Sequence, residues 1–153
     1  LDLLRQAGPP AAVAAHVREA TGPAFDHLAH EAPDNWPAHR HAELLHWRAR
    51  SQAAAFEARL DALIVQGRAD SVFLAADRAE TYDRFAARYG ARLRMIPRDL
   101  YDRSAEQLQY ALADMMALAR APHLLASTWS SFSDLAHRLA VPGQRLERSG
   151  HDF

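Results

Sequence analysis

Residues 127–133, with the sequence STWSSFS, bring five hydroxyl side chains to the start of a helical pattern. They follow a short apolar run, so a strand is expected to end where a helix begins. The unpaired N–H groups and the positive end of the helix dipole attract anions at such a junction. We expect Ser130, Ser131 and Ser133 to hold phosphate oxygens. Ser131 also fits a capping box with Asp134, which needs no ligand and is compatible with anion binding.

A second group of candidates is His16 and Arg18, which lie two residues apart near the end of a predicted strand at residues 11–20. Side chains with this spacing share one face of a strand. An arginine there can form two charge-assisted hydrogen bonds with one phosphate group. The alternative for Arg18 is a surface ion pair, with Glu19 or Asp26 as its partner.

Asp77 is the third candidate, because it directly follows the buried apolar run at residues 71–76. Its carboxylate can accept hydrogen bonds from a ribose or from the N–H edge of a purine. It can equally cap a helix that begins at Arg78. Both interpretations stay open at the level of sequence.

The elements that must position these residues alternate between strands and helices. Strands are expected at residues 11–20, 71–76, 92–96, 122–127 and 144–148, and helices at 38–66, 79–89, 105–120 and 133–140. The long segment at residues 22–37 is expected to be a loop, either a functional lid or rim or a plain connector with a helical turn at residues 25–30.

This alternation favours an α/β fold: a three-layer, Rossmann-like parallel sheet with helices on both faces. In such sheets ligands bind beyond the carboxyl ends of the strands, where the strand order reverses. If the first strand lies between the second and the fourth, all three groups of candidates face one crevice. We assign residues 1–10 to the end of an upstream linker or helix, and residues 11–153 to a single domain.

Composition limits the classes of function. With 153 residues, a net charge of −1 and 24% charged residues, the chain has no electrostatic case for binding nucleic acid or an anionic membrane. No apolar run reaches the roughly 20 residues that span a bilayer. Cysteine is absent, and every basic residue is arginine. The arginine and alanine bias is typical of a GC-rich bacterial genome, and we predict a cytoplasmic bacterial protein that begins upstream of Leu1.

Nine histidines invite a metal hypothesis, above all His27 with His30 and His39 with His41 and His46. These spacings match no closed zinc pattern, and few acids lie near them. We therefore expect no metal site, with the last three histidines on the exposed side of a helix. No sequence motif indicates an activated nucleophile either, which argues against a hydrolase or phosphatase.

Three segments resemble the motifs of GDP-fucose-dependent fucosyltransferases, a family of α-1,6-, nodulation-type and protein O-fucosyltransferases. HVRE at residues 16–19 resembles the HxRRxD motif. Residues 72–90 resemble the family's V-[FY]-[LV]-A-T-D-D strand and the helix after it. Residues 114–140 resemble the last motif, a D-x-x-x-L helix followed by a strand and an S-S-F-[ST] turn. The motifs occur in the family's order and cover most of residues 12–140.

The resemblance implies the C-terminal, donor-binding half of a GT-B glycosyltransferase that inverts the anomeric carbon and needs no metal or other cofactor, in line with the missing DxD triplet. By likeness, Arg18 holds the β-phosphate and stabilises the departing GDP. His16 and Asp77 contact the nucleoside. The turn at Ser130, Ser131 and Phe132 lines the diphosphate and guanosine pocket. The implied partners are a GDP-sugar donor and a glycan or polypeptide acceptor, the latter bound by an N-terminal half outside these residues.

Two positions depart from the family pattern. Glu19 stands in place of the second arginine of HxRRxD, and Arg78 in place of the second aspartate of the strand motif. A glutamate beside a diphosphate is repulsive. The alternative function is therefore a degenerate Rossmann-like domain that serves as a non-catalytic scaffold or interaction module.

Overall fold

The structure is a computed structural model that describes residues 2–20, 37–99 and 104–153. In chain order the elements are α1 (Asp2–Gln6), β1 (Val13–Val17), α2 (Ala38–Arg50), α3 (Ala53–Val65), β2 (Val72–Ala76), α4 (Ala79–Tyr89), the 3₁₀ turn η3 (Gly90–Arg92), β3 (Leu93–Arg94), α5 (Ala105–Arg120), β4 (His123–Ala126), α6 (Ser131–Arg138) and β5 (Arg145–Arg148). The loop expected at residues 22–37 lies almost wholly outside the described residues.

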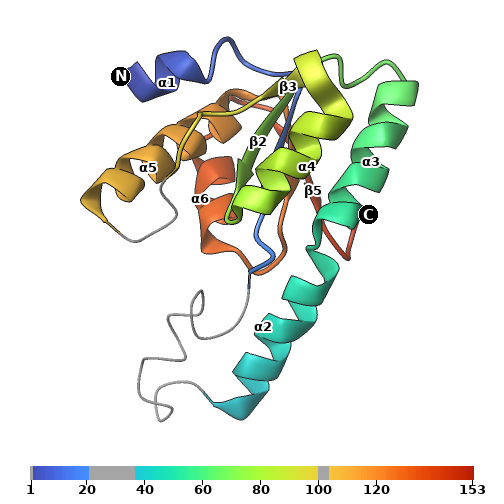
Figure 1. Cartoon of the computed structure of the whole chain (residues 1–153). Helices are drawn as coiled ribbons and strands as arrows, with labels where there is room; N and C mark the ends of the chain where they lie inside the picture. The colour runs from blue at the N-terminus through green and yellow to red at the C-terminus, as the bar shows by residue number, and fades with distance from the viewer. Residues whose placement is uncertain (1, 21–36, 100–103) are drawn as a thin grey trace.

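The five strands form one parallel sheet in the order β3-β2-β1-β4-β5 (Figure 1). Ala15 at the centre pairs with Leu74 of β2 on one side and with Leu125 of β4 on the other. From β1 the chain adds β2 and β3 on one side, and it then crosses back to add β4 and β5 on the other side. This order confirms the predicted fold class and the predicted position of the first strand between the second and the fourth.

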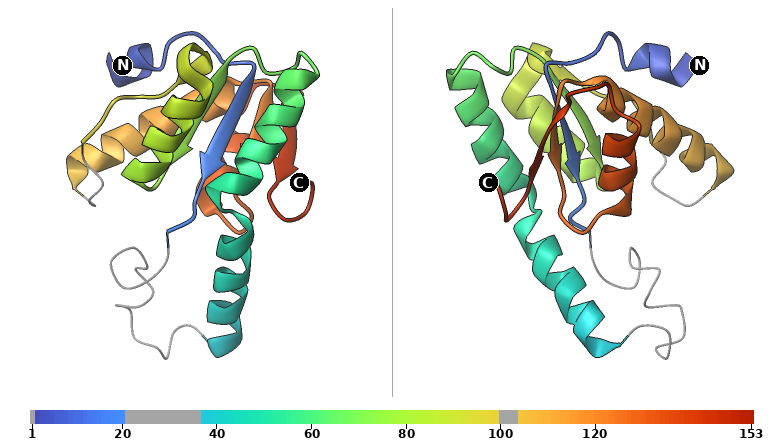
Figure 2. Two further views of the ribbon diagram at one scale, coloured as in Figure 1. Left: turned by 45° about the vertical axis from the view of Figure 1, so that its right-hand side comes forward. Right: turned by 180° about the vertical axis from the view of Figure 1, so that it is seen from behind.

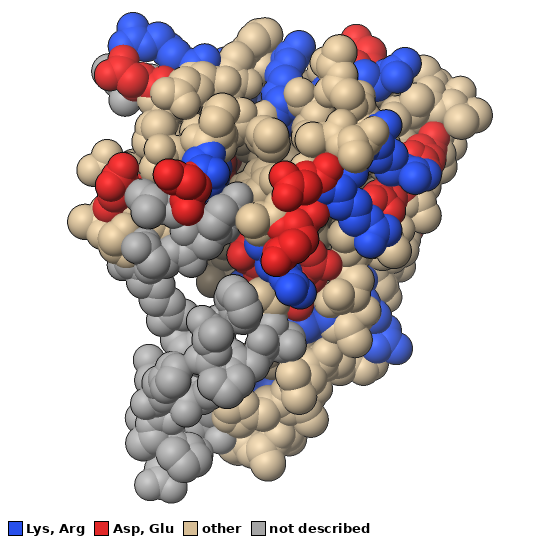
Figure 3. All heavy atoms as spheres, in the orientation of Figure 1, with Lys and Arg blue, Asp and Glu red and all other residues tan. Residues whose placement is uncertain are grey.

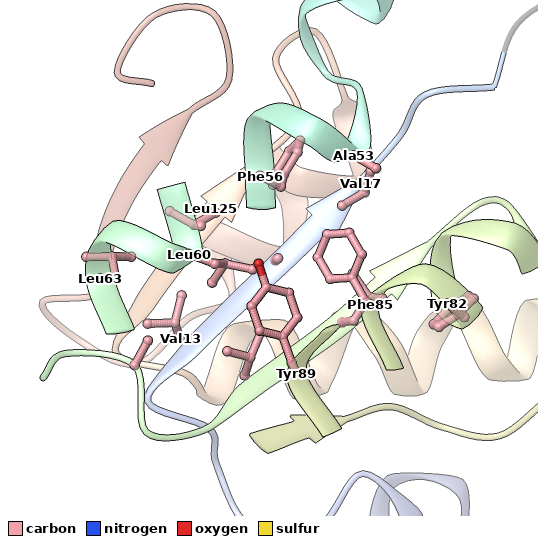
Figure 4. Close-up of a cluster of buried hydrophobic side chains, with 14 residues drawn as sticks. Val13, Val17, Ala53, Phe56, Leu60, Leu63, Tyr82, Phe85, Tyr89 and Leu125 are labelled. Carbon is pink, nitrogen blue, oxygen red and sulfur yellow. The ribbon is translucent and has the colours of Figure 1, made fainter. Parts of the chain in front are cut away.

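Helices cover both faces of the sheet. Successive side chains of β1 point to opposite faces, and because they are all buried, both faces must be covered. Val13, Ala15 and Val17 face α3 and α4, whereas Ala14 packs with α5 and α6. Figure 2 shows helices on both faces of the sheet. The larger core lies under α3 and α4 (Figure 4). Its aromatic and aliphatic members from these helices are Ala53, Phe56, Leu60, Leu63, Tyr82, Phe85 and Tyr89.

Outside this core, α3 and α4 are joined by ion pairs. Arg84 forms two hydrogen bonds with Glu57 at 2.6 and 2.5 Å, and Arg88 pairs with Asp61 one turn further along both helices. Acidic and basic side chains are accordingly interspersed over this face of the molecule (Figure 3). Both arginines are exposed, so the pairs contribute little to stability, but they leave no face of a single charge here.

The single helix predicted for residues 38–66 is wrong, because the structure breaks it into α2 and α3 at Ser51 and Gln52. Ser51 is fully buried, and its hydroxyl lies 2.7 Å from that of Ser149. The carboxylate of Glu19 accepts a hydrogen bond from Ala53 N, at the start of α3. The residues that stabilise the break, Ser149 and Glu19, are distant in sequence. The apolar periodicity continues through the break, so the sequence gives no local sign of it.

The other elements differ from prediction mainly at their ends. β1 and β3 are shorter than expected, and α6 begins at Ser131, two residues before the predicted start. The residue that caps α6 is Ser130, whose hydroxyl accepts a hydrogen bond from Ser133 N, so the capping box predicted for Ser131 is wrong. α1 lies within residues 1–10, and the assignment of that segment to an upstream linker or helix stays a prediction. None of the helices described is both long and apolar enough to cross a membrane.

Phe56 provides a test of the core under α3. Its side chain is fully buried, and its ring packs edge-on against Phe153 at 5.2 Å between centroids. We expect Phe56→Ala to lower the free energy of unfolding by about 3–5 kcal/mol, because loss of the ring leaves a cavity. The measurement is urea unfolding followed by circular dichroism.

Val65→Ala is the matched control, because Val65 lies in the same helix and is 88% exposed. It should change the free energy of unfolding by no more than about 0.5 kcal/mol. Equal losses for the two variants would contradict the burial described for α3.

Candidate functional site

A cavity of about 480 Å³ lies at the carboxyl ends of β1, β2 and β4, where the strand order reverses. This volume is within the usual range for small-molecule sites. α2 extends beyond this edge of the sheet (Figures 1 and 2). The described residues that line the cavity are His16, Arg18, Ala20, Leu44, Arg48, Ala75, Ala76, Asp77, Arg98, Gln107, Ala111, Asp114, Trp129, Ser130, Ser131 and Phe132.

The floor of the site is fixed by Ser127, which joins the ends of β1 and β4. Its backbone N–H and its hydroxyl both donate to the carbonyl oxygen of His16, at 3.1 and 2.9 Å. The same hydroxyl accepts from the backbone N–H of Arg18 at 2.8 Å. One buried serine therefore satisfies the backbone groups that the diverging strands leave unpaired. These hydrogen bonds fix the backbone position of Arg18.

His16 is a buried, neutral histidine in the cavity wall. Its Nδ1 lies 2.7 Å from the hydroxyl of Ser133, and its ring contacts Phe132 at 4.7 Å between centroids. Burial lowers the pKa of His16 to about 4, helped by the charges of Arg18 and Arg48 and opposed by Asp77. At neutral pH the ring therefore adds hydrogen-bonding capacity without charge.

Arg18 and Asp77 form an ion pair at the ends of β1 and β2, through Nη1 and Oδ2. Asp77 also accepts from the backbone N–H groups of Glu19 at 3.3 Å and Ala20 at 3.1 Å. Asp77 thus orients both the guanidinium and the turn that follows β1. It does not cap α4, whose capping residue Arg78 makes no side-chain cap bond. The cap predicted for Asp77 is therefore wrong.

Glu19 is not among the residues that line the cavity. One carboxylate oxygen accepts from Ala53 N at 3.0 Å, and the other from the hydroxyl of Thr81. A carboxylate at the start of α3 is favoured by the helix dipole. The negative charge that departs from the family motif is thus used to fix α3 and α4 to the end of β1, and does not line the cavity.

The turn between β4 and α6 forms another wall. Trp129 adopts a φ of +61°, a backbone conformation that is rare for a bulky residue and often found at functional sites. Arg40 of α2 lies over its ring at 5.6 Å. Ser130, Ser131 and Phe132 line the cavity from the N-terminus of α6.

Of the seven residues predicted for the site, the structure places six in the cavity wall: His16, Arg18, Asp77, Ser130, Ser131 and Phe132. Ser133 differs, because it is buried behind the wall and its hydroxyl holds the ring of His16. Ser133 therefore does not line the cavity itself, contrary to the prediction that it holds a phosphate oxygen. The reason is the earlier start of α6, which turns Ser133 toward the sheet.

Sequence reasoning missed an ion pair in the wall, Arg98 with Asp114. The guanidinium donates two hydrogen bonds to the carboxylate, at 2.7 and 2.6 Å, and lies between the rings of Tyr82 and Tyr110. Burial raises the pKa of Asp114 to about 6, against the opposing effect of Arg98. Asp114 is the first residue of the D-x-x-x-L pattern noted in the sequence, but that pattern alone did not indicate a partner or a place in the cavity wall.

Arg48 and Trp129 were also missed. Arg48 stands in no motif, and Trp129 lies in the turn at residues 127–133 but was assigned no role there. Sequence periodicity shows neither the helix break near Arg48 nor the left-handed conformation of Trp129. Within the described ranges, no group of three or more histidine and acidic residues is placed to bind a metal ion. His39 and His46 are exposed, as expected, and His41 is half-buried.

The fold was compared with known proteins. No family model matches the chain, and no curated protein matches it. Among solved structures it is similar to NodZ α-1,6-fucosyltransferase soaked with GDP-fucose, with 19% identity, 96% of this chain covered and a TM-score of 0.54. It is also similar to POFUT1 in complex with GDP-fucose, with 17% identity, 98% covered and a TM-score of 0.58.

The chain therefore has a fucosyltransferase-like fold, a Rossmann-like α/β domain. It spans 42% of the NodZ chain and 46% of the POFUT1 chain. At these identities the likeness establishes the fold alone, and any function must be argued from the site.

The buried neutral state of His16 makes stability depend on pH. Because its pKa is lower in the folded chain (about 4) than in the unfolded chain (about 6.5), the unfolded state binds more protons between these values. The stabilisation is complete above pH 6.5 and is lost as the pH falls toward 4. We expect the stability difference between the wild type and His16→Gln to shrink by about 3 kcal/mol over this range.

Urea unfolding at several pH values measures this difference. His39→Gln, at an exposed position, is the control and should keep the wild-type profile. A constant difference between the wild type and His16→Gln would show that His16 titrates alike in the folded and unfolded chains.

Proposed function

We propose that the chain is the donor-binding half of a GDP-sugar-dependent glycosyltransferase of fucosyltransferase type. One observation carries the proposal: Arg18 and the N-terminus of α6 line the same cavity, at the point where the strand order reverses. An arginine and a helix N-terminus are two independent devices for binding phosphate. The likeness in fold to two chains solved with GDP-fucose supports this choice of ligand.

The residues predicted for the site each have a role in the proposal. Arg18, oriented by Asp77, binds the β-phosphate, while Ser130 and Ser131 offer hydroxyl and backbone N–H groups to the diphosphate. Phe132 contributes apolar surface to the nucleoside pocket. His16 and Asp77 contact the nucleoside, and Ser133 sets the orientation of the histidine ring.

The proposed reaction is a single displacement with inversion. The acceptor hydroxyl oxygen forms a bond to the anomeric carbon, and the bond from that carbon to the β-phosphate oxygen breaks. The electron pair and negative charge go to the departing GDP, where Arg18 and the α6 N-terminus stabilise them. Because these groups neutralise the charge, we propose that no metal is needed.

The acceptor, a glycan or a polypeptide, would bind to a second half of the enzyme, and that half would also supply the base that takes the hydroxyl proton. The coverage of less than half of the two similar chains supports a second half of this kind. We propose a cytoplasmic bacterial enzyme, on the strength of the arginine-rich, alanine-rich composition.

Isothermal titration calorimetry with GDP tests the proposal. We expect saturable binding that Arg18→Ala weakens by about 1.5–3 kcal/mol, the usual contribution of a hydrogen bond to a charged group. Arg138→Ala removes an exposed arginine from the other end of α6 and should leave the affinity unchanged. No heat with GDP or GDP-fucose at millimolar concentration would rule out a donor site.

A second candidate function is a non-catalytic interaction module, which a particular surface favours. Leu108, Leu112 and Met116 are exposed and recur every four residues along α5, forming an apolar ridge. Such a ridge is typical of a helix that meets a partner. This candidate predicts no nucleotide binding, so the same titration distinguishes the two functions.

A further inference from the structure

Arg48 is a buried cation on a helix that is otherwise exposed or half-exposed. It belongs to the last turn of α2, and among residues 38–50 it alone is buried, with 7% of its surface exposed. Taking a guanidinium out of water is costly unless charge or hydrogen bonds compensate. Arg48 therefore differs from the rest of α2, because its charge is placed inside the molecule.

The guanidinium of Arg48 belongs to the same cavity as Arg18. Both residues line it, and the charges of both lower the pKa of His16, which lies beside them in the wall. The described wall carries three arginines against two aspartates, an excess of one positive charge. The net charge of the described wall thus favours an anionic ligand.

The backbone of Arg48 is fixed by the break between α2 and α3. Its carbonyl oxygen accepts from Gln52 Nε2 at 2.8 Å and from Ser51 N at 3.1 Å. The buried Ser51 and Ser149 hydroxyls then connect this corner to Thr128, whose N–H donates to Ser149 Oγ at 3.2 Å. Arg48 is therefore tied to the turn that leads into α6, and its position is set before a ligand arrives.

We propose that Arg48 is a second phosphate-binding residue, which acts with Arg18 so that the cavity selects a nucleoside diphosphate over the monophosphate. The inference deepens the proposed donor site and rests on it. Arg18 approaches from the end of β1, and Arg48 approaches from α2. Two guanidinium groups that lie in one wall but come from different elements can divide the charge of two linked phosphates between them.

Calorimetry with GDP, GMP and guanosine tests the selection. We expect Arg48→Gln to weaken GDP binding by about tenfold to a hundredfold, and to weaken GMP binding less, so that the ratio of the two affinities falls. Arg48→Lys keeps the charge and should recover part of the ratio. A purely structural role would weaken both nucleotides alike and leave the ratio unchanged.

Arg50→Gln is the matched control, because Arg50 lies two residues further along α2, is exposed, and contacts His46 outside the cavity. It should leave both affinities unchanged. A measurement that needs no variant is the NMR signal of the Arg48 side-chain N–H, which should shift with GDP and not with guanosine.

The outcomes separate the two proposals. If the wild-type chain binds GDP but Arg48→Gln keeps the wild-type ratio of GDP to GMP affinity, the role of Arg48 is wrong and the donor site stands. The role of Arg48 is also wrong if its side-chain signal responds equally to guanosine. If the wild-type chain binds no GDP, both proposals are wrong.

Discussion

The junction between β1 and β4 is the constraint on which the rest of the site depends. These two strands are neighbours, yet the helices that follow them lie on opposite faces of the sheet, so the chain must separate just beyond their ends. The hydroxyl of Ser127 at the end of β4 holds the end of β1, because it donates to the carbonyl oxygen of His16 and accepts from the backbone N–H of Arg18. Without this hydroxyl the N–H of Arg18 would lose this partner, at a cost of about 1–3 kcal/mol. With it, the separation becomes a cavity whose floor is fixed.

The charged residues around this junction hold the chain in position as well as pairing with one another. Glu19 and Asp77 both use backbone N–H groups, so that one carboxylate fixes the start of α3 and the other the turn after β1. Arg98 and Asp114 form a buried ion pair within the wall. Buried pairs of this kind contribute little net stability compared with apolar residues, but removing one partner is costly. We interpret them as a means of holding the wall in one arrangement.

Much of the fold could be predicted because its signals are local. The apolar runs at residues 71–76 and 122–127, each flanked by helical periodicity, predict parallel strands without any long-range information. The site was predictable to the same extent, since Arg18, Asp77 and the turn before α6 follow directly from strand ends. The ends of parallel strands must meet at one edge of the sheet, so placing the strands also places these side chains.

What could not be predicted depends on contacts between residues far apart in the chain. The break after Arg50 is made by Ser51 with Ser149 and by Glu19 with Ala53, partners 98 and 34 positions apart. Arg48 lines the cavity from the last turn before that break, and Ser133 does not line it because Ser130 caps α6. Periodicity does not distinguish such cases: the apolar spacing runs on through the break, yet Leu45 before it is exposed whereas Phe56 and Leu60 after it are buried.

The measurement that tests the central claim most directly is a titration of the ¹⁵N-labelled chain with GDP, followed by NMR. The cavity where the strand order reverses should be the site, so the amide signals of Arg18, Ser131 and Phe132 should move and reach saturation together. Signals from the exposed ridge at Leu108, Leu112 and Met116, which lies outside the cavity, should stay in place. Shifts confined to that ridge, or no saturable shift at all, would contradict a nucleotide site at the end of β1.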